Sequence, residues 1–380
     1  MITIVGGELL CALGDGPERL AALRRGKPNI GTVTVDVGQV EVTYPYYRID
    51  ETSRLSDPAI VDNYLDRVVN SLLRKLKLQA SDLDNVGVFL GSSSIDYSLA
   101  WPIEESVAED FVLRCDRKRV GGGNYLESLS QRFAFSGPSL TFNTACTSSA
   151  NALLAAVSML EGEIIDFALV LGLELYSPTT LEGFAMMQLL SPEAIRPFAQ
   201  NRNGIVLGEA VSAVLLSRDD IMPSAWCYLG GRSSCETFSV IGAHPSGAGI
   251  AQVIQAALAD AVIGPETITA IKTHGTASDL NDQAEMRGME QVFAALPPYL
   301  SLKPYIGHTL GGCGVAELLL LMESVDAGFI PASINCETLD CEFSSSPVTQ
   351  SLFLTSGHFM LNYFGFGGNN TSFVIEKMAS

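Results

Sequence analysis

The stretch Ser139–Met159, SLTFNTACTSSANALLAAVSM, decides the fold prediction. Leu140–Phe142 has the alternation of a short strand, and Ala150–Met159 is rich in Ala and Leu without Gly or Pro, which predicts a buried helix. Cys146 lies in the turn between them. Unpaired N–H groups at a helix start favour a thiolate, although a cysteine in such a place is often just a small apolar residue. Cys146 is therefore a candidate nucleophile that the rest of the chain has to support.

The length of the chain predicts two fused halves. Its 380 residues exceed what a single hydrophobic core usually holds, and its 47% hydrophobic and 17% charged residues are ordinary for a globular enzyme. Apolar strand-like runs alternate with helical segments along the whole chain, which predicts an α/β fold with helices on both faces of its sheets. We expect one half at residues 1–220 and the other at residues 221–380.

The net charge of −19 argues against nucleic acid and anionic membranes as partners. No apolar run is long enough to span a membrane, and the N-terminus has the pattern of a first strand and not of a signal peptide. The eight cysteines show neither a CxxC pair nor metal-ligand spacing, so we expect reduced thiols, no bound metal and a cytoplasmic protein.

An acidic protein partner remains compatible with this charge if it meets a local basic patch. Two clusters of basic residues are candidates, although either could be an ordinary solvated face. They are Arg114, Arg117, Lys118 and Arg119, and Arg67, Arg74, Lys75 and Lys77.

Three glycine-rich loops in the second half each follow a predicted strand. They are Lys272–Thr276, Lys303–Gly314 and Asn362–Asn370, and the first two contain His274 and His308. Loops at strand ends commonly carry catalytic groups. A thiol, imidazole groups and a loop that offers backbone N–H donors are what acyl transfer through a thioester requires. The sequence therefore predicts such a site.

Four ordered motifs carry a specific resemblance. They are TACTSSA around Cys146, THGTASDLND around His274, SLKPYIGHTLGGCGVAE around Lys303 and His308, and GFGGNN at Gly365–Asn370. In these motifs the chain resembles the β-ketoacyl-[acyl carrier protein] synthases of the elongating Cys-His-His type. The resemblance implies the thiolase fold, an α/β architecture layered α-β-α-β-α and built from two similar halves.

The resemblance also implies catalytic roles. Cys146 matches the nucleophile that accepts an acyl chain, and His274 and His308 match the pair that promotes loss of CO2 from malonate and stabilises the enolate. Lys303 matches the lysine that orders the His308 side, and Glu317 matches its carboxylate partner. Taken alone, Glu317 would be an ordinary surface residue of a helix.

Further positions match supporting roles. The backbone N–H groups of Cys146 and Phe366 match the oxyanion hole, and the Phe366 ring matches a gate over the thiol. The remaining matches are Thr276 and Ser278 to the pantetheine-binding hydroxyls, Phe184 to the acyl pocket, and Asp282 and Glu285 to the supporting network. Outside this context the two acidic residues would be a charge pair at a helix N-terminus.

The implied activity is acyltransfer. A malonyl unit on acyl carrier protein loses CO2 and condenses with the acyl group on Cys146, in fatty acid, polyene or polyketide elongation. No cofactor is expected, since phosphopantetheine arrives on the acyl carrier protein, and we expect a homodimer or a heterodimer with a related subunit. The alternative is a partner subunit of the chain-length-factor kind, which lacks the nucleophile. A thiolase would need a second cysteine in the GFGGNN loop, and a starter synthase would pair one His with an Asn.

The sequence departs from the family pattern near the expected pockets. Glu236–Ser239, leading to His244-Pro245, replaces an Asp-x-x-His-x-x-x-Pro element, Ala199–Asn201 lacks a common aspartate, and Ile205 stands where an aromatic residue is frequent. These changes favour a member specialised for polyene or polyketide-like chains.

Overall fold

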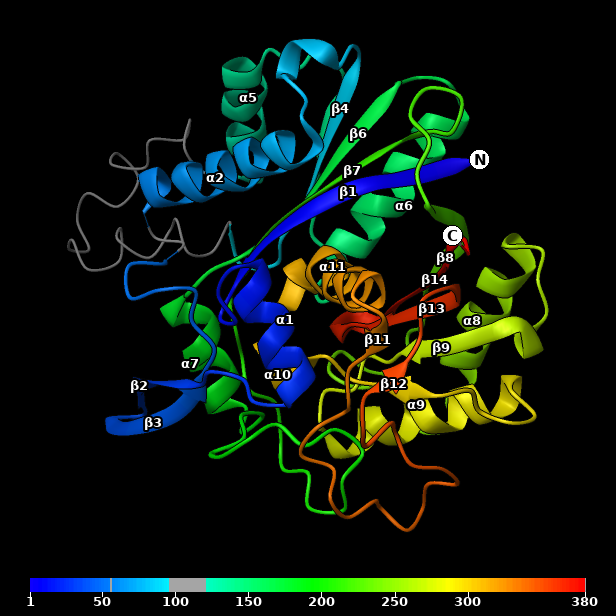
Figure 1. Ribbon diagram of the computed structural model, residues 1–380. Helices are drawn as coiled ribbons and strands as arrows, with labels where there is room; N and C mark the ends of the chain where they lie inside the picture. Colours follow the sequence, from blue (N-terminus) through cyan, green and yellow to red (C-terminus); the bar gives the residue numbers. More distant parts are fainter. Residues whose placement is uncertain (55–56, 96–120, 380) are drawn as a thin grey trace.

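The computed structural model describes residues 1–54, 57–95 and 121–379 (Figure 1). The basic cluster at residues 114–119, a candidate surface for an acidic partner, lies outside the described residues. No helix in the described part of the chain has the length and hydropathy needed to cross a membrane.

The first half of the chain contains a run of strands and helices close to the predicted ones. Its elements are β1 (Ile2–Cys11), α1 (Gly16–Arg25), β2 (Gly31–Val37), β3 (Val40–Tyr46), α2 (Pro58–Leu76), η1 (Ala80–Asp82), β4 (Val86–Gly91), α5 (Gly122–Phe133), β5 (Ser139–Phe142), α6 (Ser148–Glu161), β6 (Phe167–Glu174), α7 (Pro178–Met186) and β7 (Ala210–Arg218). The first strand predicted at the N-terminus is β1, which extends to Cys11, and the hairpin β2–β3 was not predicted. Its residues Val33, Val35 and Val37 alternate with polar residues and pack into a hydrophobic cluster, so the pattern of a half-buried strand was present in the sequence.

The second half repeats the alternation. Its elements are β8 (Trp226–Cys235), α8 (Ala248–Asp260), η2 (Pro265–Thr267), β9 (Ile268–Lys272), α9 (Asp279–Val292), β10 (Tyr299–Leu300), α10 (Lys303–Ile306), η3 (Leu310–Gly312), α11 (Cys313–Asp326), β11 (Phe329–Ile330), β12 (Leu352–Phe353), β13 (Gly357–Phe364), η4 (Phe366–Gly368) and β14 (Asn369–Lys377).

The main sheet shows that the two halves share one topology. Its order is β10-β9-β13-β14-β8-β1-β7-β6-β4-β5. Read outward from its centre, the order β1-β7-β6-β4-β5 has the same connectivity and the same strand directions as β8-β14-β13-β9-β10. The halves meet where β1 pairs with β8, at Ile2 with Tyr228 and Thr3 with Cys227. The predicted fold of two similar halves is thus confirmed, while the boundary at residue 220 stays a prediction.

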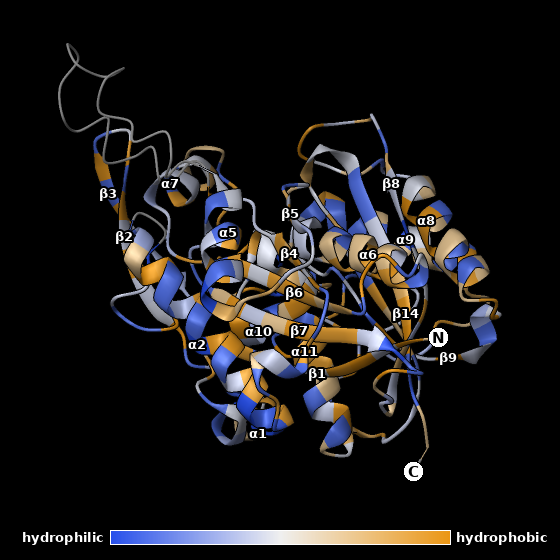
Figure 2. Ribbon diagram, turned by 90° about the horizontal axis from the view of Figure 1, so that it is seen from above, coloured by the Kyte–Doolittle hydropathy of each residue, from blue (hydrophilic) through white to orange (hydrophobic). Residues whose placement is uncertain are grey.

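Two central helices bring the halves together. α6 follows β5 in the first half, α11 follows the corresponding β10 in the second, and the two helices pack against each other between the strands. α2 and α5 cover the outer face of the first half, and α8 and α9 that of the second (Figure 1). Figure 2 shows β1 and β7 largely in hydrophobic colours, whereas α2 alternates between hydrophilic and hydrophobic turns. This arrangement directs the start of α6 and the loop before α11 to one place.

Candidate active site

Cys146 lies in a tight turn between β5 and α6, as predicted. Ala145, just before it, has a φ of 52°, an unfavourable conformation for a residue with a Cβ. Hydroxyl groups hold the turn: Ser148 Oγ donates to the Ala145 carbonyl over 2.6 Å, and Thr147 Oγ1 donates to the Thr144 carbonyl over 2.7 Å. The Cys146 backbone carbonyl accepts a hydrogen bond from the Cys313 thiol at 3.0 Å. These bonds fix the backbone on both sides of Cys146.

The Cys146 thiol is protonated at rest, contrary to the expectation that a helix start favours the thiolate. Burial raises its pKa to about 11 and outweighs the opposing effects of the Lys303 charge and of the backbone N–H groups of Phe366 and Cys146. Only 5% of Cys146 is exposed, so the loss of hydration dominates. The thiol therefore needs a base within hydrogen-bonding distance.

The imidazole of His308 lies within that distance. Its Nε2 lies 3.1 Å from Cys146 Sγ. The backbone of His308 is fixed by the segment before β7, because its N–H donates to the Val206 carbonyl over 2.7 Å and its carbonyl accepts the Gly208 N–H over 3.1 Å. Gly307 has a φ of 72°, and a Cβ there would lie 2.7 Å from the Leu207 carbonyl oxygen. A glycine is required for this approach.

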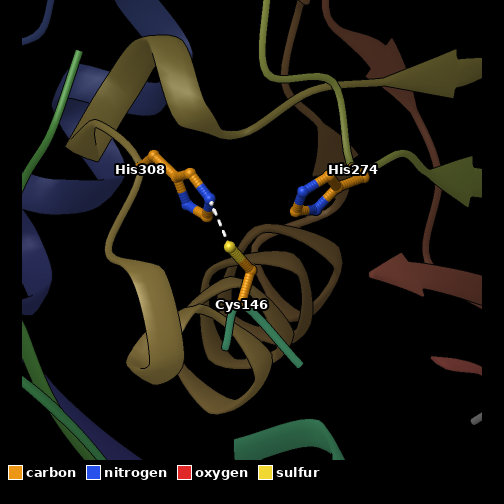
Figure 3. A group of neighbouring side chains, drawn as sticks. All are labelled: Cys146, His274 and His308. Carbon is orange, nitrogen blue, oxygen red and sulfur yellow. Dashed lines mark hydrogen bonds between the residues drawn. The ribbon is translucent and has the colours of Figure 1, made fainter. Parts of the chain in front are cut away.

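His274 faces the same sulfur from the opposite side, as Figure 3 shows. The centres of the two imidazole rings are 5.3 Å apart, and the donor atoms of Cys146, His274 and His308 all lie within 4.8 Å of one another. Burial lowers the pKa of both histidines well below the usual value, and nearby Lys303 and Lys272 lower it further. Both rings are therefore neutral at neutral pH.

Two buried carboxylates of α9 hold the loop that carries His274. Glu285 accepts the N–H groups of His274 and Gly275 over 2.7 and 2.8 Å. Asp282 accepts those of Thr276 and Ala277, over 3.0 and 3.1 Å, and that of Phe198 over 2.8 Å. Burial raises the pKa of Asp282 to about 6 and that of Glu285 to about 7, although these hydrogen bonds oppose the shift.

Glu317 lies in the protein interior between two lysines. Lys303 Nζ is 2.7 Å from its Oε1 and Lys272 Nζ is 2.6 Å from its Oε2, and all three side chains are 0% exposed. This excludes a surface position for Glu317. The positive charges of Lys272 and Lys303 disfavour the binding of a divalent metal ion by Cys146, His274 and His308. We therefore assign no metal ligand among these three residues.

Cys146 opens onto two cavities, one on each side of a stacked aromatic pair. Phe184 on α7 and Phe366 in the GFGGNN loop stack with their ring centres 5.7 Å apart, and both line both cavities. A cavity of about 450 Å³ contains His274, His308, Thr276 and Ser278 in its wall, with Thr276 Oγ1 and Ser278 Oγ 3.3 Å apart. A second cavity of about 280 Å³ lies on the other side and is lined mainly by α7 and residues 93–94. The thiol is thus accessible from two directions.

Sequence comparisons agree with this geometry. Residues 2–220 match the N-terminal domain and residues 228–337 match the C-terminal domain of beta-ketoacyl synthase. The chain belongs to the β-ketoacyl synthase family.

Several similar proteins are named as 3-oxoacyl-[acyl-carrier-protein] synthases. 3-Oxoacyl-[acyl-carrier-protein] synthase II of Arabidopsis thaliana is 30% identical over 265 residues, 65% of this chain and 48% of the relative. 3-Oxoacyl-[acyl-carrier-protein] synthase 2 of Synechocystis is 30% identical over 258 residues, 63% of this chain and 62% of the relative. The matched region thus spans about half to three fifths of these relatives.

The fold extends over whole solved structures. The complex of the ketosynthase ApeO with its chain length factor ApeC from Xenorhabdus doucetiae contains a chain that is 28% identical, with a TM-score of 0.86 over 99% of this chain and 98% of that one. A β-ketoacyl synthase from Burkholderia phymatum, 22% identical with a TM-score of 0.85, shows the same fold.

Some residues of this β-ketoacyl synthase site were not singled out from the sequence. Lys272 lies two residues before His274, within a loop already noted, but nothing in the sequence indicated its contact with Glu317. Glu174, at the end of β6, is buried and accepts the N–H groups of Ser93, Ser94 and Gly311. The sequence did contain a signal for Glu174, because it is a charged residue at the end of an otherwise apolar strand.

Proposed function

We propose that this chain is a β-ketoacyl-[acyl carrier protein] synthase that condenses malonyl-carrier protein with an acyl group held on Cys146. The observation that carries the proposal is the 3.1 Å contact between Cys146 Sγ and His308 Nε2, with His274 opposite and a cavity leading to all three. Family membership supports it.

In the first half-reaction an acyl group moves to the enzyme. His308 Nε2 takes the proton of the Cys146 thiol while the sulfur attacks the carbonyl carbon of the acyl thioester. The backbone N–H groups of Cys146 and Phe366 stabilise the tetrahedral oxyanion. The bond to the pantetheine sulfur then breaks, and that sulfur leaves with the proton held by His308.

In the second half-reaction malonate supplies the nucleophile. Its carbon–carboxylate bond breaks, CO2 leaves, and the electron pair forms an enolate whose oxygen accepts N–H hydrogen bonds from His274 and His308. For this step the neutral His308 ring carries its proton on Nε2, so between the half-reactions its proton moves from Nδ1 to Nε2 by exchange with water. The enolate carbon attacks the acyl carbonyl, the bond to Cys146 Sγ breaks, and the sulfur regains one proton from solvent. Neutral imidazoles suit this role because the charge they stabilise appears only during the reaction.

The other matched residues support this machinery in the proposal. Lys303 and Glu317 order the His308 side, and Asp282 and Glu285 fix the loop of His274. Thr276 and Ser278, whose hydroxyls line the larger cavity, bind the pantetheine arm. Lys303, Glu317, Asp282 and Glu285 are all buried, Lys303 Nζ donates to Glu317, and Asp282 accepts the Thr276 N–H, which supports these roles.

We assign the acyl chain to the smaller cavity, with Phe184 in its wall and Phe366 as the gate. Ile205 and Phe238, two positions where the sequence departs from its family, line the larger cavity. They line the cavity assigned to the pantetheine arm and not the cavity assigned to the acyl chain, so the proposal of a polyene or polyketide-like chain rests on the sequence departures alone. Equal turnover of saturated and unsaturated primers would count against that specialisation.

The partners in this proposal are acyl carrier protein and a second ketosynthase subunit. β5, at the edge of the main sheet, is exposed, with 37% of Leu140 accessible, which leaves an edge for pairing with another subunit. A solved relative is a ketosynthase with its chain length factor, which makes a heterodimer as reasonable as a homodimer. No cofactor beyond the carrier's phosphopantetheine takes part. The free thiols of the seven cysteines in the described residues support a cytoplasmic location.

Mass spectrometry after incubation with acyl-carrier protein tests the assignment. We expect an acyl adduct on Cys146, lost in Cys146→Ala and retained in Cys235→Ala, which removes an exposed thiol. If the wild-type protein forms no adduct with any chain but restores activity to a related synthase, the chain is a chain-length-factor-like partner subunit.

A further inference from the structure

Lys272, the last residue of β9, is a fully buried lysine for which the family resemblance gives no role. Its Nζ lies 2.6 Å from Glu317 Oε2, 2.7 Å from the carbonyl oxygen of Asn362 and 3.4 Å from the centre of the Tyr363 ring. The Tyr363 hydroxyl donates elsewhere, to the Gly314 carbonyl, so the face of the ring is what meets the ammonium group. These three partners fix Lys272 in one position.

This lysine changes the charge of the site. Glu317 carries one negative charge and accepts hydrogen bonds from two ammonium groups, so Lys272, Lys303 and Glu317 together carry a net charge of +1. A single lysine would have left the pair neutral. The positive excess is shielded from water, and buried charges act over longer distances than exposed ones.

Burial raises the pKa of the acidic groups around the cluster, which reduces the negative charge available to offset this excess. Cys313 stays a neutral thiol because burial raises its pKa far above the usual value, and burial raises the pKa of Glu285 to about 7. The remaining groups of this kind near the cluster are Cys146, His274, His308, Tyr363 and Glu174.

Lys272 stays charged at neutral pH, although burial lowers its pKa to about 8 against the attraction of Glu317. For Lys303 burial also acts against the charge, but Glu317 outweighs it and raises the pKa. Both lysines act on the imidazoles, since each lowers the pKa of His274 and of His308 beyond the larger effect of burial.

We propose that Lys272 is a positioning residue of this site: it holds Glu317 from the side opposite Lys303 and adds a second buried positive charge next to His274 and His308. The role of Lys272 in the reaction rests on the proposed function. Malonate arrives with a negative carboxylate, and an enolate replaces it after CO2 leaves. A fixed positive charge lowers the energy of both, and it keeps the imidazoles uncharged before they are needed.

The test uses NMR of protein labelled at histidine, because the chain has only four histidines. The perturbed variant is Lys272→Met, which keeps the length of the side chain without the charge. Lys27→Met, at an exposed position, removes the same charge as a matched control. His244 and His358, which lie outside the site, serve as internal references.

In the wild-type protein and in Lys27→Met we expect His274 and His308 to remain neutral from about pH 5 to pH 8 and to titrate only below about pH 5, so the series is continued to the lowest pH at which the protein stays folded. In Lys272→Met the apparent pKa of at least one of them should rise by roughly one pH unit, the size of effect that one nearby charge exerts, while the reference histidines stay unchanged. Unchanged titration of both site histidines in Lys272→Met would overturn the proposal, as would ordinary titration of both in the wild type.

A second variant separates charge from packing. Lys272→Ala leaves space for a small amine, so ethylammonium should restore the wild-type titration and ethanol of similar size should not. Restoration by both would show a packing role only and overturn the proposal. The NMR readout needs no turnover, so a failure of the condensation assay in the wild type would refute the proposed function and leave this result standing.

Discussion

Replacing Glu317 by Gln should cost the protein a large share of its stability. The carboxylate is 0% exposed and lies between two ammonium groups that are also 0% exposed. An amide has one oxygen acceptor and no charge, so Glu317→Gln leaves Lys272 and Lys303 mutually repelling in the interior. Breaking a buried ion pair by removing one partner costs about 3–5 kcal/mol. Against a total of roughly 5–15 kcal/mol for a folded protein, this is a severe loss.

Urea unfolding followed by far-ultraviolet circular dichroism measures the effect. Glu161→Gln is the control, because Glu161 is exposed at the end of α6 and its loss should change the unfolding free energy by less than about 0.5 kcal/mol. The double variant Lys272→Met/Glu317→Gln removes one of the two repelling charges. It should be more stable than Glu317→Gln alone by about 1–3 kcal/mol.

The reasoning fails if Glu317→Gln loses less than about 1 kcal/mol, or if the double variant is as unstable as the sum of its single variants. Either result would mean that the two lysines and Glu317 do not form one coupled cluster.

Other substitutions test the positions around the thiol. Gly307→Ala places a Cβ 2.7 Å from the Leu207 carbonyl oxygen at a φ of 72°. It should lower the unfolding free energy by about 1–3 kcal/mol, and it should lower kcat because it displaces His308. A wild-type kcat would contradict this. The Glu285 pKa of about 7 exceeds the value of about 4.3 for a free Glu, so the folded state binds more protons and this group's contribution to stability falls as pH rises from about 4 to 7. Glu285→Gln should flatten the stability profile there, and a parallel profile would count against it. Phe184→Ala joins the two cavities and should shift the primer preference toward longer chains, which competition between primers measures; an unchanged preference would refute that placement.

The fold could be predicted because its strongest signals are local. The strand of Leu140–Phe142 and the Ala-rich helix after Cys146 follow from residue type and spacing, and both appear within a few residues of the expected bounds. The hairpin β2–β3 was not predicted, although Val33, Val35 and Val37 alternate with polar residues as in a half-buried strand.

Only the family resemblance predicted that the site residues lie together, because they are far apart in the sequence. Cys146 and His308 are 162 residues apart, and nothing in either segment alone indicates a 3.1 Å contact. The expectation of a thiolate at Cys146 was wrong. Backbone N–H groups lower the pKa of its thiol, but burial removes the hydration of the sulfur and raises the pKa by more. Lys272 was missed for a related reason: its burial depends on Asn362 and Glu317, which only the folded chain brings beside it.

A single-turnover reaction tests the central claim most directly. Protein acylated beforehand and freed of excess acyl donor is mixed with malonyl-carrier protein, and CO2, the residual acyl adduct and the 3-oxoacyl product are measured together. The account predicts one CO2 and one 3-oxoacyl-carrier protein for each acyl group lost from Cys146, and no product from the Cys146→Ala protein. Acyl groups that remain on the protein while CO2 is released, or product formed without Cys146, would contradict it.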